Sequence, residues 1–190
     1  MKYVTVLLPG SFKPMHQGHI GLIKRYINHP SVKKIKVLIG PGTRNGITQQ
    51  RAYKIARILL GLNIDLEKTK YITPVLASYK YMENAIPGTY AFAGVSKGND
   101  YKRVTKFVND FNGKYPLPNN VYVKELIVDT IEPTLYKGRT DDKNGLPISA
   151  SVLRQDVLNN DFVNFVTNYS STEWHQIKQI WNILQSIIIK

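Results

Sequence analysis

Apolar and polar positions alternate along the chain in a way that predicts strands and helices in turn. Residues 3–8 and 35–39 are almost continuously apolar, as in strands that are covered on both faces. Between these two runs, Ile20, Ile23 and Ile27 recur at helical spacing, which predicts an amphipathic helix. The same two patterns predict further elements: strands at 71–76, 90–95 and 121–128, and helices at 100–111, 149–159, 162–169 and 172–188.

Capping residues predict two more helices. The first follows Thr48 and carries four apolar residues, Ile55, Ile58, Leu59 and Leu62. The second follows Ser78 and ends near Ile86. The polar, glycine-containing segment 135–147 predicts a surface loop.

Strands that alternate with helices favour a parallel sheet covered on both faces. Because crossover connections are right-handed, we expect an α/β fold, a Rossmann-like three-layer sandwich with a five-stranded, mostly parallel sheet, plus C-terminal helices. Residues 1–161 are expected to form this α/β domain, and residues 162–190 a helical extension packed on it or on a partner subunit. Ligands of such sheets bind at the carboxyl ends of the strands, which here follow Leu8, Ile39, Gly94 and Val128.

The C-terminal helix carries an apolar stripe. Its members are spaced three and four residues apart: Trp174, Ile177, Trp181, Leu184 and Ile188. Such a stripe covers either the core of the same chain or a second copy, so the pattern leaves a homo-oligomer open.

Composition narrows the classes of function. The chain has 190 residues with 26 Lys+Arg and 13 Asp+Glu, and its net charge of +13 predicts attraction to an anion such as a nucleotide, a nucleic acid or an acidic membrane. It has no Cys, which excludes thiol nucleophiles and thiolate metal sites. No apolar run approaches the ~20 residues of a membrane-spanning helix, so we expect a soluble, cytoplasmic protein with no membrane partner.

The loop after the first predicted strand contains the strongest candidate for chemistry. It reads Pro-Gly-Ser-Phe-Lys-Pro-Met-His-Gln-Gly-His from Pro9 to His19. The helix that follows presents unpaired N–H groups and a partial positive charge to an anion. His16 and His19 can face one side of its first turn and bind phosphate oxygens, and Gly18 permits close approach. A solvated loop or a pair of metal ligands would explain two neighbouring histidines equally well.

A second helix start offers a similar site. Ser149 is a natural N-cap, Ser151 lies in the first turn, and Arg154 falls on nearly the same face three residues later. Hydroxyl groups and a guanidinium suit a polyphosphate. Taken alone, this segment is more simply a capped surface helix.

Together the two segments resemble the His-x-Gly-His nucleotidyltransferase superfamily, or cytidylyltransferase-like superfamily, which includes nicotinamide-nucleotide and pantetheine-phosphate adenylyltransferases. Residues 10–19 are similar to its first motif, Gly-Ser-Phe-x-Pro-x-His-x-Gly-His, and residues 148–154 to its second, Ile-Ser-x-Ser-x-x-Arg. The resemblance covers residues 1–161. It implies a nucleotidyltransferase that transfers a nucleoside monophosphate to the phosphate of a small metabolite and releases pyrophosphate, with ATP as the expected donor and CTP as the alternative.

The resemblance also implies roles for individual residues. The implied catalytic residues are His16, His19 and Arg154. Nucleotide-binding positions are implied at Gly10, Ser11, Phe12, Gly18, Gly94, Asp100, Ser149 and Ser151, and acceptor-binding positions at Ser11, Lys13 and Arg44. An exposed loop cation and a helix N-cap are the plain alternatives for Arg44 and Asp100. Magnesium (Mg2+) is expected as a cofactor carried mainly by the triphosphate, because no acidic cluster suggests a protein cage for a metal.

Two features depart from the family pattern. Lys13 stands where many members carry Asp or Gln. Cytidylyltransferases have Arg-Thr immediately before the Gly-Ile-Ser of the second motif, whereas Arg139 and Thr140 lie several residues upstream here. The second departure favours adenylyl transfer from ATP.

Two other classes of function compete with this one. A basic nucleic-acid-binding protein on the same fold would use the clusters Lys33-Lys34-Lys36 and Lys102-Arg103-Lys106, which are otherwise solvated surface. A class I aminoacyl-tRNA synthetase shares the His-x-Gly-His idea. The chain is too short for such an enzyme and lacks its Lys-x-Ser-Lys-type motif.

Overall fold

The computed structural model describes residues 4–30, 32–84, 90–93, 102, 106, 109–110, 122–123, 149–169 and 172–188. Its elements are, in chain order, β1 (Val4–Gly10), α1 (Gln17–Ile27), β2 (Val32–Ile39), α2 (Gln49–Leu60), β3 (Asp65–Lys68), α3 (Pro74–Glu83), β4 (Tyr90–Ala93), β5 (Tyr122–Val123), α5 (Ala150–Leu158), α6 (Phe162–Thr167) and α7 (Trp174–Ile188). No helix among the described residues is long and apolar enough to cross a membrane. The loop expected at 135–147 and most of the strand expected at 121–128 lie outside the described residues.

The strands form one sheet in the order β3-β2-β1-β4-β5, and every pair is parallel. β1 pairs with β2 on one side and with β4 on the other, so the direction of the chain across the sheet reverses beside β1. This order is Rossmann-like, and the α/β class with a parallel sheet is confirmed. In sheets of this kind, ligands bind at the carboxyl ends of the strands beside such a reversal, which here are β1 and β4.

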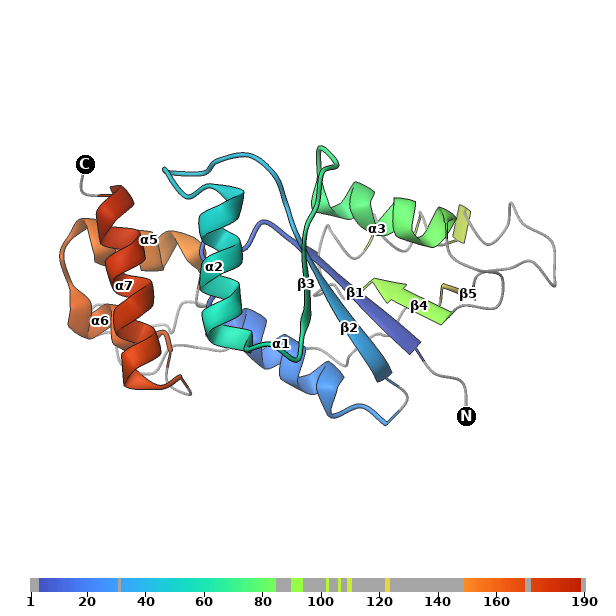
Figure 1. Cartoon of the computed structure of the whole chain (residues 1–190), viewed down its shortest axis with the longest axis horizontal. Helices are drawn as coiled ribbons and strands as arrows, with labels where there is room; N and C mark the ends of the chain where they lie inside the picture. The colour runs from blue at the N-terminus through green and yellow to red at the C-terminus, as the bar shows by residue number, and fades with distance from the viewer. Residues whose placement is uncertain are drawn as a thin grey trace.

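Helices cover both faces of the sheet. Because the β1-α1-β2 and β2-α2-β3 units step in the same direction, right-handed crossovers place α1 and α2 on one face, whereas α3 returns across β2 and β1 on the other. Figure 1 shows α1 and α3 on opposite sides of these strands. Val6 and Leu8 share a buried cluster with α1 and α2, and strand alternation directs the equally buried Leu7 to the opposite face.

The C-terminal helices pack beside α2 and extend the same core. α7 contacts α2 and α5, and α5 also contacts α6 (Figure 1). The apolar stripe of α7 lies against this core at Ile177, Trp181 and Leu184, whereas Trp174 is 58% exposed. Most of the stripe therefore covers the core of its own chain.

The prediction of a strand at 71–76 is wrong. The third strand is β3, where Leu66 is the buried residue, and the expected segment instead starts α3. Thr73 caps this helix by accepting a hydrogen bond from the backbone N–H three residues later at 3.0 Å, and Pro74 occupies the first helical position. Proline suits that position because the N–H it lacks would have no partner within the helix. Ser78, expected to start the helix, lies inside it.

The helix after Thr48 begins as predicted and ends earlier than predicted. The Thr48 hydroxyl accepts a hydrogen bond from a backbone N–H in the first turn at 3.3 Å. Gly61 follows the last helical residue with a φ of 67°, a conformation that glycine adopts readily and that ends the helix. Leu62 is therefore not part of the apolar face and is 88% exposed.

Candidate active site

The loop between β1 and α1 brings the first motif to the carboxyl edge of the sheet. The carbonyl of Gly10 accepts a hydrogen bond from the N–H of Gly40 at 2.9 Å, so this loop lies beside the loop after β2. A Cβ at Gly10 would lie 2.5 Å from the Phe12 ring, which explains why a side chain does not fit there. The Phe12 ring in turn meets His19 edge-on, with the ring centroids 4.9 Å apart. Glycine at position 10 therefore leaves room for the ring that packs against His19.

His16 and His19 lie together at the start of α1. His16 is the N-cap, and its backbone N–H donates a hydrogen bond to Nδ1 of His19 at 3.3 Å. Because Nδ1 accepts this bond, the neutral His19 ring carries its proton on Nε2, which becomes the donor. The two ring centroids are 3.8 Å apart, and Nδ1 of His16 is buried with no hydrogen-bond partner among the described residues. A Cβ at Gly18 would lie 3.2 Å from the His16 ring, so glycine keeps this space open.

Burial keeps both imidazoles neutral. His16 is 8% exposed, and burial lowers its pKa to about 4. Burial, and secondarily the adjacent His16, lower the pKa of His19 to about 3. At neutral pH both rings can therefore bind phosphate oxygens through N–H groups without being cations.

α5 brings the second motif to the same loop. Ser149 caps α5 by accepting a hydrogen bond from the backbone N–H three residues later at 3.4 Å. The guanidinium of Arg154, 7% exposed, donates to the Ser151 hydroxyl at 3.0 Å and to the Lys13 carbonyl at 2.6 Å. Lys13 is 141 residues away in the sequence and lies in the loop that carries His16. The two segments singled out by the sequence therefore meet in space.

Three cations gather where these segments meet. Lys13 is 4% exposed, and its ammonium donates to the carbonyls of Gly40 at 3.2 Å and Pro41 at 2.8 Å. Burial, and then the neighbouring Arg44 guanidinium, lower the pKa of both Lys13 and Arg154. Within the described part of the chain, none of the three forms an ion pair with a carboxylate. Uncompensated cations beside two neutral imidazoles are suited to bind an anion.

The remaining candidates divide into two groups. Ser11 and Arg44 are exposed, in the loops that follow β1 and β2 respectively. Gly94 and Asp100, expected after β4, lie outside the described residues.

Two further residues support this edge and were missed by the sequence analysis. Tyr169, which follows α6, donates its hydroxyl to the carbonyl of Met15 at 2.8 Å across 154 residues. Gln49, in the first turn of α2, donates to the carbonyls of Ile39 and Thr69 at 2.8 and 2.7 Å and thereby joins the ends of β2 and β3. Bonds from a side chain to a distant backbone carbonyl leave no local pattern in the sequence.

The basic clusters expected to bind a nucleic acid are partly neutralised. Three of their lysines have acidic partners: Lys34–Asp65 at 3.0 Å, Lys36–Glu67 at 2.5 Å and Lys106–Asp110 at 2.5 Å. These pairs reduce the positive field that a phosphate backbone would meet.

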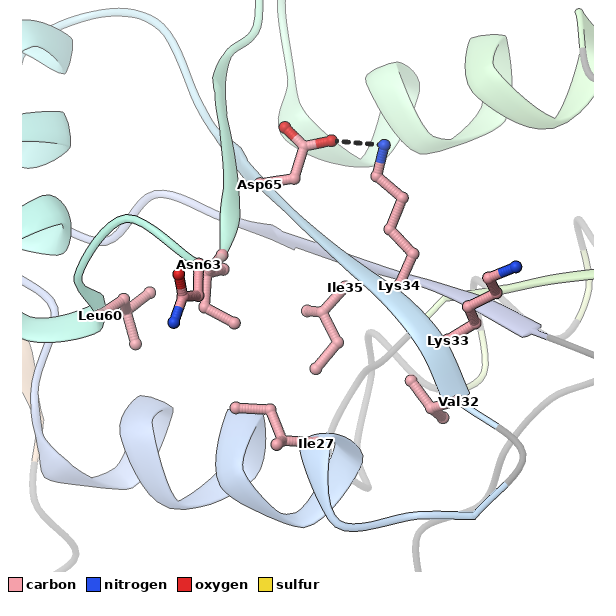
Figure 2. Close-up of a pocket in the computed structure, with 9 residues that line it drawn as sticks. Ile27, Val32, Lys33, Lys34, Ile35, Leu60, Asn63 and Asp65 are labelled. Atoms are coloured by element: carbon pink, nitrogen blue, oxygen red, sulfur yellow. Dashed lines mark ion pairs between the residues drawn. The ribbon is translucent and has the colours of Figure 1, made fainter.

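A cavity of about 490 Å³ lies at the opposite, amino edge of β2 and β3. Its lining consists of Ile27, Val32, Lys33, Lys34, Ile35, Leu60, Asn63, Ile64 and Asp65. Figure 2 shows the ammonium of Lys34 directed at the carboxylate of Asp65. The carboxyl ends of α1 and α2 border this cavity, and the negative end of a helix dipole disfavours anions. Anion chemistry therefore fits the carboxyl edge better.

The described residues contain no group of three or more His, Cys, Asp or Glu side chains that could hold a metal ion. A divalent cation at the carboxyl edge would therefore need ligands other than a cluster of such side chains from the described residues.

The fold and the site together define a class: a Rossmann-like α/β protein whose candidate anion site lies where the loop after β1 meets α5. Neither a family model nor a curated protein sequence matches the chain. Solved structures do match it.

One such structure is a bifunctional NMN adenylyltransferase/ADP ribose pyrophosphatase from Francisella tularensis, with a TM-score of 0.59 and 14% sequence identity. The match covers 100% of this chain and 53% of that chain, so the protein described here spans about half the length of the bifunctional one. Another is a nicotinic acid mononucleotide adenylyltransferase from Plasmodium falciparum complexed with APC, with a TM-score of 0.51, 15% identity and 100% coverage of both chains. The chain therefore shares the fold of nucleotide adenylyltransferases.

Proposed function

We propose that this protein is an adenylyltransferase, which joins AMP from ATP to the phosphate of a small metabolite and releases pyrophosphate. The proposal depends on one observation, the hydrogen bond of 2.6 Å from Arg154 to the Lys13 carbonyl. This bond joins the start of α5 to the loop that carries His16 and His19. The fold shared with two adenylyltransferase structures supports the same class of reaction.

In the proposed reaction, an oxygen of the acceptor phosphate attacks the α-phosphorus of ATP. The bond from that phosphorus to the oxygen bridging to the β-phosphate breaks, and pyrophosphate leaves. The acceptor phosphate is already a nucleophile, so the protein needs no catalytic base. Its task is to hold two anions in line and to stabilise the charge that develops on the α-phosphate and on the leaving group.

The residues of the first motif are assigned to the α-phosphate. His19 donates a hydrogen bond from Nε2 to an α-phosphate oxygen. The buried Nδ1 of His16, which has no partner in the described part of the chain, is available to the same ligand. Gly10, Phe12 and Gly18 shape the loop around these rings.

The residues of the second motif are assigned to the β- and γ-phosphates. Arg154 supplies positive charge, and Ser149 lies at the positive end of α5. The Ser151 hydroxyl accepts a bond from Arg154, so its own proton remains free to donate to a phosphate oxygen. Gly94 and Asp100 belong to this proposal as residues that contact the nucleotide after β4. Magnesium enters as part of the substrate, carried by the phosphates of ATP.

The acceptor phosphate is assigned to Ser11, Lys13 and Arg44. An ammonium has three N–H donors, and the carbonyls of Gly40 and Pro41 use two of those on Lys13. The third remains for an anion, beside the exposed guanidinium of Arg44.

The assay incubates the protein with ATP or CTP, magnesium and a panel of phosphate esters, and follows pyrophosphate. The panel includes NMN and nicotinic acid mononucleotide, because the two enzymes that share the fold are named for these acceptors. We expect turnover with ATP. Turnover with CTP and not with ATP would show that CTP is the nucleotide donor. A folded protein that releases no pyrophosphate with any combination of nucleotide and acceptor would contradict the proposal.

Replacing His19 by Ala tests the assigned chemistry. Loss of one donor to the developing charge should lower kcat by about 10²–10³-fold. His175→Ala is the matched control, because His175 is exposed on α7 and should leave turnover unchanged. Circular dichroism of both variants shows whether the fold is retained.

A further inference from the structure

The peptide group between Met15 and His16 is bonded on both sides. Its carbonyl accepts a hydrogen bond from the Tyr169 hydroxyl at 2.8 Å, and its N–H donates to Nδ1 of His19 at 3.3 Å. A continuous chain of hydrogen bonds thus runs from Tyr169 through one peptide group to the His19 ring. Hydrogen bonds connected in this way polarise one another, so a donor on the carbonyl strengthens the N–H as a donor.

We propose that Tyr169 is a positioning residue for His19: through the Met15–His16 peptide group, its hydroxyl fixes the orientation of the imidazole and keeps the proton on Nε2. The catalytic part of this inference, an effect on turnover, rests on the proposed function. The structural part, which concerns the tautomer of His19, stands on the hydrogen bonds alone.

The packing around the Tyr169 ring fixes the position of its hydroxyl. Tyr169 and Met15 are both fully buried, and the Tyr169 ring packs against Phe165 with the ring centroids 5.3 Å apart. Phe165 in turn meets Trp181 of α7 edge-on at 5.0 Å. The aromatic cluster of the C-terminal helices therefore aims the hydroxyl, and burial raises the pKa of Tyr169 so that it stays a donor.

Losing the hydroxyl would free the peptide group. Met15 and Tyr169 are fully buried, so loss of the hydroxyl leaves the Met15 carbonyl without this partner and favours rotation of the peptide group. Rotation would withdraw the His16 N–H from Nδ1 of His19. Without that donor the imidazole can carry its proton on either nitrogen, and the fraction with a proton on Nε2 falls.

The test compares Tyr169→Phe with Tyr26→Phe. Tyr26 is a second fully buried tyrosine of the same core cluster, and its hydroxyl has no hydrogen-bond partner in the described structure. Each variant deletes one oxygen from a buried ring, but only the first breaks the chain of hydrogen bonds. A purely structural role of tyrosine in the core would give the same result for both.

The readout is the ¹⁵N NMR spectrum of the His19 ring in protein labelled at histidine, which distinguishes a proton on Nε2 from one on Nδ1. We expect Nε2 protonation in the wild type and in Tyr26→Phe, and a mixture of tautomers in Tyr169→Phe. The same variant should lower kcat by up to about 100-fold, as expected for a misplaced catalytic group, with little change in the KM for ATP.

An unchanged His19 tautomer in Tyr169→Phe, or an equal change in Tyr26→Phe, would overturn the inference. If the wild type shows no transfer at all, the proposed function fails while the tautomer still decides the role of Tyr169. If Tyr169→Phe does not fold, the rate at which the Tyr169 hydroxyl proton of the wild type exchanges with water tests the inference instead. A slowly exchanging Tyr169 O–H resonance close to the His16 amide supports the inference, and rapid exchange with water contradicts it.

Discussion

Basic side chains behave in opposite ways in two regions of this molecule. On β2 and β3, Lys34 and Lys36 lie opposite carboxylates, with Lys36 2.5 Å from Glu67 and 3.5 Å from Asp65. At the carboxyl edge, Lys13, Arg44 and Arg154 gather without a carboxylate among the described residues. The first group is neutralised by the protein itself. In the second group, neutral carbonyl and hydroxyl groups hold Lys13 and Arg154, and Arg44 is exposed, so the protein leaves these charges without a neutralising partner among the described residues.

This contrast separates cations that are paired within the fold from cations that we propose to bind a ligand. Two buried cations beside a third repel one another, and this repulsion reduces the stability of the folded state. An anion that enters the site relieves the repulsion and stabilises the folded state. The ion pairs of β2 and β3 gain nothing from such a ligand.

Lowering the pH should distinguish most strongly how the two regions contribute to the free energy of unfolding. The folded pKa of His16 is about 4, below its usual 6.5, so the unfolded state binds more protons between these values and the stability is lost as the pH falls from about 6.5 to about 4. The loss is on the order of 3 kcal/mol for His16, and His19 adds to it in the same direction.

The β2–β3 region should respond at lower pH. Burial raises the pKa of Asp65, but Lys34 and Lys36 outweigh it, so the net pKa is lowered and this contribution is lost only as the pH falls below the usual range of an aspartate. Urea unfolding at about pH 7, 5 and 4 measures the histidine window, and further points at about pH 3 and 2 measure the Asp65 window. A His16→Gln variant that loses as much stability between about pH 6.5 and 4 as the wild type would contradict the assignment.

Replacing Arg154 by Met should cost about 2 kcal/mol of unfolding free energy, because the Lys13 carbonyl loses a charged donor. Binding of inorganic pyrophosphate, measured by calorimetry, should weaken at least about tenfold, which corresponds to 1.4 kcal/mol.

Arg57→Met is the matched control for this variant. Arg57 also donates to backbone carbonyls, those of Gly61 at 2.7 Å and Ile64 at 3.1 Å, but it lies at the end of α2 away from the site. It should lose stability and keep pyrophosphate binding. Equal weakening of binding in both variants would remove the distinction between the two regions.

Replacing Lys36 by Met should have the smallest effect. Its partners are partly exposed, and such pairs contribute below about 1 kcal/mol. Thermal unfolding should show a small decrease that shrinks with added salt, and pyrophosphate binding should stay unchanged. A loss of binding as large as that in Arg154→Met would show that the β2 lysines act on the anion site.

The elements that could be predicted are those specified by neighbouring residues. The buried strands β1 and β2 follow from short apolar runs, and the starts of α2 and α5 follow from Thr48 and Ser149, whose hydroxyls bond within three residues. The apolar runs of this sequence favoured a strand at 71–76, although Thr73 followed by Pro74 is a helix start. β3 was missed because an edge strand with Leu66 as its buried residue shows little apolar pattern.

The sequence singled out residues that the structure brings together, but not the bonds that connect them. His16, His19 and Arg154 were found because each lies near a helix start, where anions bind. The bonds that assemble them cross 141 and 154 residues and end on the carbonyls of Lys13 and Met15. Every residue has a carbonyl, so a sequence cannot show which one a distant side chain will select.

The close approach of Gly46 to Ile187 limits where a label can be attached to this protein. Arg44 and Ile47 exchange backbone hydrogen bonds of 3.1 and 3.0 Å, which close a tight turn at 44–47. A Cβ at Gly46 would lie 2.5 Å from Cγ2 of Ile187, so this turn lies against the last turn of α7. The N-terminal side of β1 lies at the other edge of the sheet (Figure 1). A bulky label therefore belongs on that side of β1, since one attached at Ile187 would press on the turn at 44–47.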